Sequence, residues 1–207
     1  MVADTEARRE SARSKRSHIL STAIEKFGQV GYEQTKWATV AGEVGIGQTA
    51  LYHYFESKAH CLLTIMRLEL ADSVDRFVAA TENQDEPEQA LRAAVAGALA
   101  GTPTDALQRR ILQSHMDLLT APRQSEKEEA ERLRSRELVH QIEQNWAGLV
   151  SRGMDAGVFI EGDPRLLGQL ILGMIVSIWR WYRPQGNLSL AEITETISTS
   201  AVRMLVK

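Results

Sequence analysis

The sequence predicts an all-α fold in which a small N-terminal helix-turn-helix domain precedes a larger C-terminal helical domain. Apolar residues recur at helical spacing through most of the 207-residue chain. Ser, Pro and Gly residues that start or end helices stand at the borders of these stretches. Residues 31–58, GYEQTKWATVAGEVGIGQTALYHYFESK, contain two short helical patterns joined by a tight glycine turn. A hydrophobic content of 43% is enough to fill the core of such a fold.

The first helix is expected over residues 12–29, where Ile19, Ile24 and Phe27 share one face. Residues 1–12 precede it and are expected to form a mobile, basic tail. Arginines of this tail either stay in solvent or reach a nucleic-acid partner, and the sequence leaves both possibilities open.

Residues 36–54 have the spacing of a helix-turn-helix. The first helix is predicted over residues 36–43, and Gly45 follows it, where the chain needs a left-handed residue. Ile46 then fills the inside of the corner, and a second helix covers residues 47–54. In such motifs the second helix lies in the DNA major groove.

The second helix has two distinct sides. Ala50, Leu51 and Phe55 can face inward, while the opposite side carries Gln48, Thr49, Tyr52 and His53. Amide, hydroxyl, phenol and imidazole groups can hydrogen-bond to base edges or phosphates. A polar face can also be merely solvated, but the glycine turn and the run LYHYF favour DNA binding.

The remaining helices follow from their caps and periodicity. Ser57 caps a long helix that runs to residue 80 and connects the two domains. The loop 81–87 leads to a helix over 85–101, and Thr102 to Thr104 are expected to break the chain. Further helices are predicted over 105–119, 125–154, 164–182 and 189–205, where the second and the last begin with the capping boxes Ser125/Glu128 and Ser189/Glu192. The charged run EKEEAERLRSRE is expected to be a solvated face.

Residues 15–65 resemble the TetR family of bacterial regulators. The resemblance rests on GYEQT and on VAGEVGIGQTALYHYFESK. It implies a DNA-binding domain over residues 1–58, a ligand-binding and dimerisation domain over 59–207, and a homodimer formed through the last two helices on a palindromic operator. The residues that it implies for DNA contact are Thr35, Lys36, Gln48, Thr49, Tyr52, His53, Tyr54 and Lys58.

The chain departs from the family pattern at the start of the first helix of the motif. Lys36 and Thr39 stand where the family has a Thr and an acidic residue, so the capping box is absent. Thr35 is expected to cap instead, and Lys36 to contribute a charged phosphate contact. Gly47 and Thr49 also differ from the pattern, so the operator sequence does not follow from the resemblance.

The C-terminal half resembles a subgroup linked to lipid and steroid degradation, on NWAGLVSRGMDAGVF and SIWRWYRPQGNLS. This implies a repressor that a hydrophobic or acyl-CoA-type inducer releases from DNA. Each Trp and Met of this half can equally be a core or dimer contact, and control by a protein partner without an inducer stays an alternative. The residues that the resemblance suggests for the ligand are His115, Met116, Leu119, Trp146, Met174, Ile178, Arg180 and Arg183.

Composition limits the other classes of function. Residues 1–60 carry 8 Lys/Arg against 7 Asp/Glu, whereas residues 61–207 carry 16 against 20, so the N-terminal part is the more basic. No apolar signal-peptide core or 18-residue apolar stretch occurs, which predicts a cytoplasmic protein without a membrane partner. Phosphate loops, GxSxG and metal-ligand spacings are absent, so neither an enzyme nor a cofactor is expected. Cys61 is expected to be a buried thiol, and His60 an exposed side chain.

Overall fold

The computed structural model describes residues 2–206, with side chains described from residue 13 onward. Within that range the chain is almost entirely helical, so the predicted all-α class is confirmed. An isolated bridge between Phe159 and Val206 is its one extended pairing within those residues. The elements are α1 (Val2–Val30), α2 (Trp37–Val44), α3 (Gln48–Tyr54), α4 (Lys58–Thr81), α5 (Pro87–Leu99), α6 (Pro103–Ser114), the 3-10 turn η1 (Met116–Leu119), α7 (Glu126–Asp155), α8 (Pro164–Trp181) and α9 (Leu190–Leu205).

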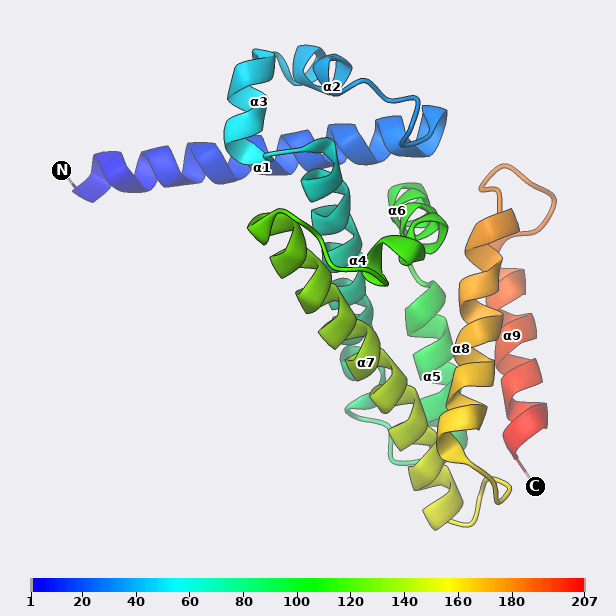
Figure 1. The fold of residues 1–207 in the computed structure, drawn as a ribbon. Helices are drawn as coiled ribbons and strands as arrows, with labels where there is room; N and C mark the ends of the chain where they lie inside the picture. The colour runs from blue at the N-terminus through cyan, green and yellow to red at the C-terminus, as the bar shows by residue number, and fades with distance from the viewer. Residues whose placement is uncertain (1, 207) are drawn as a thin grey trace.

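Helices α1, α2 and α3 form a head at one end of the molecule (Figure 1). Its core consists of fully buried or nearly buried apolar side chains from all three helices, among them Ile19, Phe27, Val40 and Leu51. Gly45 ends α2 with φ of +70°, the left-handed conformation that glycine adopts at little cost. The predicted helix-turn-helix is therefore present.

Helix α1 is longer than the sequence pattern suggests. It begins at Val2, and the predicted mobile tail over residues 1–12 is helical from residue 2 onward. The reason is local, since no Pro or Gly occurs before Gly28 and the first turns are rich in Ala, Glu and Arg.

Helix α4 connects the head to the rest of the chain, which we call the body. The Ser57 hydroxyl accepts a hydrogen bond from the His60 amide and caps α4, as predicted. Cys61, Leu62 and Ile65 are all fully buried, because the start of α4 is covered by the head and by α7. Burial raises the pKa of the Cys61 thiol, which fits the expected structural role.

The body packs α7 against α4 on one side and against α8 on the other, with α5 between α4 and α9 (Figure 1). Helix α6 lies beneath α1 and is the main contact of the body with the head besides α4. Helices α8 and α9 run along one edge, where Leu166, Leu170 and Trp181 of α8 stay about half exposed. None of the helices in the described chain is long and apolar enough to cross a membrane.

Helix α6 differs from its predicted bounds. The expected break is present but lies over residues 100–102 rather than 102–104, because the Thr102 hydroxyl and the Asp105 carboxylate form a capping box and α6 starts at Pro103. The helix then ends at Ser114, and the predicted continuation to Leu119 is a separate 3-10 turn after His115.

Two further expectations are wrong. His60 is buried, because its ring packs edge-on against Phe55 and its Nδ1 accepts a hydrogen bond from the Glu56 amide. The charged run at the start of α7 is also only partly solvated. Arg132 is buried and pairs with Glu129, while Glu131 pairs with Arg67 across on α4.

Candidate DNA-reading surface and ligand cavity

The outer side of α3 carries the polar side chains that the sequence singled out. Leu51 is fully buried and Phe55, which follows the helix, is fully buried too, so these two residues fix the inward side of α3. The opposite side is exposed and consists of Gln48, Thr49, Tyr52 and His53. Tyr52 has the largest of these side chains, and 46% of its surface is exposed. The surface offers hydrogen-bond donors and acceptors of base-reading type, and its contact with DNA stays a prediction.

Lys36 lies at the N-cap of α2. Its side chain is exposed and makes no capping hydrogen bond, so the first amides of α2 have no side-chain cap. A cation next to an uncapped helix N-terminus is suited to a phosphate.

Thr35 serves a different purpose from the cap expected of it. The residue is buried, and its hydroxyl donates to the Gly31 carbonyl at 2.7 Å. Its side chain therefore holds the turn between α1 and α2 and neither caps α2 nor points to solvent.

Lys58 is also committed within the protein. Its Nζ donates to the carbonyls of Tyr32 at 2.8 Å and Thr35 at 3.1 Å, and it lies 4.2 Å from the centre of the Tyr32 ring. Tyr54 is half-buried, and its carbonyl accepts a hydrogen bond from Arg16 at 2.7 Å. Arg16 thus connects the end of α3, and Lys58 the start of α4, to the rest of the head.

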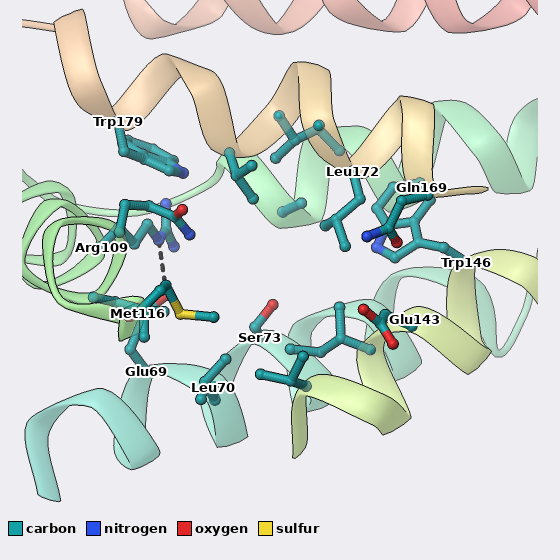
Figure 2. Close-up of a pocket in the computed structure, with 18 of the residues that line it drawn as sticks. Glu69, Leu70, Ser73, Arg109, Met116, Glu143, Trp146, Gln169, Leu172 and Trp179 are labelled. Atoms are coloured by element: carbon teal, nitrogen blue, oxygen red, sulfur yellow. Dashed lines mark hydrogen bonds and ion pairs between the residues drawn. The ribbon is translucent and has the colours of Figure 1, made fainter. Parts of the chain in front are cut away.

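A cavity of about 350 Å³ lies in the body between α4, α6, α7 and α8 (Figure 2). Its middle is apolar, with Leu70 of α4, Ile142 and Trp146 of α7, and Leu172 of α8 around it. Of the residues suggested for the ligand, Met116 and Trp146 line this cavity. Leu119 lines an adjoining, more open pocket that shares Met116, Val139 and Glu143 with the cavity and also includes Arg136 and His140.

The other suggested ligand residues do not line either space. His115 turns toward the head, with its ring 5.4 Å from that of Tyr32 and its Nδ1 2.8 Å from the Ile111 carbonyl. Ile178 is part of the buried core, and Met174 packs against that core. Arg180 and Arg183 are exposed. Helix α8 is apolar nearly all round, so its pattern could not identify the side that faces the cavity. That side carries Gln169, Leu172, Gly173, Val176 and Trp179.

One end of the cavity contains a buried charged cluster that the sequence reading missed. Glu69 is 3% exposed, and its Oε1 accepts from Arg109 Nε at 3.0 Å and from Arg76 at 2.7 Å. Arg109 also donates to the Ala100 carbonyl at 2.6 Å and stacks 4.7 Å from the Trp179 ring centre. Burial raises the pKa of the Glu69 carboxyl and lowers the pKa of the Arg109 guanidinium, whereas their pairing opposes both shifts.

A signal for this cluster does exist in the sequence. Glu69 lies four residues after Ile65, on the apolar stripe of α4, and Arg109 lies three residues before Leu112 on that of α6. Charges on apolar stripes are buried only when they are paired.

The cavity and the head are connected through α6 and η1. Met116 lines the cavity, and the preceding residue, His115, contacts Tyr32 of the head. Earlier in α6, Leu107 lies under α1 so closely that a Cβ at Gly28 would be 2.9 Å from its Cδ2. At the start of α4, Ser57 donates to Glu128 of α7 at 2.6 Å. A shift of α6 or α7 would therefore change the contacts that join the body to the head.

Two family models match the chain. Residues 19–65 match the model described as bacterial regulatory proteins, tetR family, and residues 84–205 match the model described as Tetracyclin repressor-like, C-terminal domain. The first match contains the α3 surface, and the second contains most of the cavity wall.

The chain is also similar to individual proteins. The chain is 23% identical over 180 residues to the fatty acid metabolism regulator protein of Bacillus subtilis (strain 168), covering 81% of this chain and 84% of that protein. Its structure is similar to the TetR family transcriptional regulator PfmR of Thermus thermophilus, with 28% identity, a TM-score of 0.79 and coverage of 89% and 97% of the two chains. It also shares its fold with AibR, solved with isovaleryl coenzyme A and operator DNA, with 19% identity, a TM-score of 0.74 and coverage of 90% and 97%.

Proposed function

The chain belongs to the TetR family of bacterial transcriptional regulators, and on that premise we propose that it is a homodimeric repressor released from a palindromic operator by a small hydrophobic or acyl-CoA-type inducer. As a member of this family it is a transcriptional regulator rather than an enzyme. The cytoplasm, where bacterial DNA lies, is its proposed location.

The exposed polar side of α3 is the main observation in favour of DNA binding. Four hydrogen-bonding side chains lie on one side of a helix whose other side is anchored by Leu51. Lys36 and the N-terminus of α2 beside it supply phosphate contacts. Thr35, Tyr54 and Lys58 take the supporting role of fixing the head, through the internal hydrogen bonds described above.

The uncovered edge of α8 and α9 supports the dimer. Leu166, Leu170 and Trp181 are 49–58% exposed on one helix, which is unusual for large apolar side chains that stay in water. A second copy of the chain would bury them and would set two α3 helices about one DNA turn apart, roughly 34–36 Å or a multiple. The twofold symmetry of such a dimer requires an inverted-repeat operator.

The cavity favours an inducer over control by a protein partner alone. A volume of about 350 Å³ lies in the range of small-molecule sites, roughly 300–1,000 Å³, and its wall is mostly apolar. The names of the relatives, a fatty acid metabolism regulator and a regulator bound to isovaleryl coenzyme A, support a ligand with an acyl part. At ~30 Å³ per water-sized group the cavity holds only about a dozen non-hydrogen atoms, so a coenzyme A moiety would remain outside.

Release follows from a population shift between two arrangements of the heads. An inducer that binds better to the arrangement with low operator affinity weakens DNA binding by that difference in affinity. The Met116, His115 and Tyr32 contacts give a direct route from the cavity to the head. A switch from 1:99 to 99:1 requires about 10⁴-fold preference for one state.

The test begins with selection of bound sequences from random DNA duplexes by the purified protein. We expect an inverted repeat, bound by a dimer in analytical ultracentrifugation, and a loss of binding when acyl-CoA thioesters of increasing chain length are added. Selection without enrichment would refute the DNA-binding proposal. An enriched operator whose binding no thioester or free acid changes would instead favour a regulator controlled by a protein partner.

A further inference from the structure

The charged cluster at one end of the cavity has polar atoms to which no described residue bonds. Both arginines contact the same carboxylate oxygen, Glu69 Oε1, while no described residue donates to Oε2. The Nε–H of Arg76 is buried and also has no hydrogen-bond partner among the described residues. Glu69 and Arg76 both line the cavity. An acceptor, Glu69 Oε2, and a buried donor, the Arg76 Nε–H, are thus available beside the apolar middle of the cavity.

Groups of this kind are costly to leave without partners. A buried polar atom without a partner lowers the stability of the fold, and a charged one lowers it more. Arg109 does not share this property, because it donates to Glu69, Leu99 and Ala100. The Glu69–Arg76 pair, held in place by Arg109, is therefore the part of the cluster that a ligand can still satisfy.

We propose that the inducer carries, on its apolar body, an uncharged group that both donates and accepts hydrogen bonds, such as a hydroxyl or a carboxamide, and that this group binds between Glu69 and Arg76. The inference rests on the proposed role of the cavity as inducer site. It goes further, because it states that a plain hydrocarbon chain is not the best ligand.

Charged end groups fit this position less well. A carboxylate would satisfy Arg76 but would place a second negative charge against Glu69. An ammonium group would satisfy Glu69 but would face the guanidiniums of Arg76 and Arg109. A hydroxyl can donate to Glu69 Oε2 and accept from Arg76 at the same time.

The apolar body has its own place in the cavity. Figure 2 shows Glu69 and Arg109 toward one end and Trp146, Gln169 and Glu143 toward the other, with Leu70 and Leu172 between them. An unbranched or ring-shaped hydrocarbon part of up to about a dozen atoms fills this middle. Any larger polar part would leave through the adjoining pocket near Arg136 and His140.

Matched eight-carbon probes test the inference on the full-length protein without DNA. Octan-1-ol and 1-methoxyheptane are isomers of equal size, but only the alcohol can donate a hydrogen bond. Octanamide, octanoate and octylammonium complete the set. Binding is followed by the fluorescence of tryptophan, since Trp146 and Trp179 line the cavity. We expect the alcohol and the amide to bind roughly tenfold or more tightly than the ether and both ions.

Two variants test whether Glu69 and Arg76 cause these differences in probe affinity. Glu69→Gln presents amide N–H groups in place of the carboxylate oxygen, so the preference for the alcohol over the ether should largely disappear. Arg76→Met leaves Glu69 paired with Arg109 and removes a cation, so octylammonium should bind several-fold better than it does to the unchanged protein. Arg92→Met is the control, because Arg92 pairs with Glu88 on the surface of α5 and does not line the cavity; its probe affinities should be unchanged.

Equal affinity of the two isomers for the unchanged protein would overturn the inference even if Glu69→Gln failed to fold. Tightest binding of octanoate would overturn it as well, since the cluster would then recognise an anion. Absence of saturable binding by every probe would refute both this inference and the cavity as inducer site. Operator selection, measured separately, would reveal whether the DNA-binding proposal itself had failed.

Discussion

Lys36 of the head and Lys58 at the start of α4 should respond in opposite ways to replacement by alanine. Lys58 donates to two backbone carbonyls, of Tyr32 and Thr35, and lies over the Tyr32 ring. Lys36 is exposed at the N-cap of α2, where no side-chain cap is formed. We therefore expect Lys58 to stabilise the head, and we propose Lys36 as a phosphate contact.

The size of the Lys58 effect follows from its contacts. Hydrogen bonds to charged groups contribute about 1.5–3 kcal/mol each, and a cation over an aromatic ring about 0.5–1 kcal/mol at exposed sites. Because Lys58 is only half-buried and water can replace part of these contacts, we expect a loss of about 2 kcal/mol from Lys58→Ala. In a chain of this length that corresponds to a fall in melting temperature of about 4–8 °C.

Lys36→Ala should leave the melting temperature unchanged, because exposed substitutions usually stay within about ±0.5 kcal/mol. It should instead reduce the slope of log affinity against log salt by about 0.9 per protomer, as expected for one lost phosphate contact. Thermal unfolding by circular dichroism and salt titration of operator binding measure the two effects. If Lys58→Ala melted like the unchanged protein and flattened the salt dependence, our assignment of Lys58 would be wrong.

Three further substitutions probe the other parts of the molecule. Tyr52→Ala removes an exposed side chain of α3 and should lower operator affinity at least about fivefold without lowering the melting temperature; unfolding of the head would contradict the outward position of Tyr52. Trp181→Glu should convert the dimer to a monomer in analytical ultracentrifugation if the exposed edge of α8 is the interface. Glu129→Gln tests pH dependence: hydrogen bonds from Arg132 and the Arg123 amide lower the pKa of Glu129 from 4.5 to about 2, so its stabilisation is present above pH 4.5 and lost as the pH falls toward 2. The variant should be less stable than the unchanged protein at pH 7, and the difference should shrink between pH 4.5 and 2.

The sequence predicted best those features that depend on neighbours along the chain. Ser57, Ser125 and Ser189 were recognisable helix starts because a cap satisfies amides only two or three residues away. The side of α3 was also predictable, since Leu51 and Phe55 are four residues apart and define one stripe.

Features that depend on partners distant in sequence were missed. Glu69 and Arg109 are 40 residues apart, and nothing in either helix alone reveals that they meet. Helix α8 has apolar residues nearly all round, so its pattern could not show that Met174, Ile178 and Arg180 lie away from the cavity. Lys58 matched a position expected to contact phosphate, but the carbonyls that it binds come from residues 23 to 26 positions earlier.

The charges of the head also limit how strongly salt can affect operator binding. Among the described cations up to residue 58, Arg16 and Lys26 form contacts within the head, where Lys26 pairs with Glu43 at 2.5 Å, and Lys58 of α4 binds carbonyls of the head. Arg13, Lys15 and Lys36 remain for phosphates, which gives about six contacts per dimer and a salt slope of about −5. Deleting residues 1–12 should leave this slope unchanged if the basic first turns of α1 stay in solvent. A markedly steeper slope that the deletion reduces would show that Arg8 and Arg9 bind DNA, and our assignment of the phosphate contacts would then be too small.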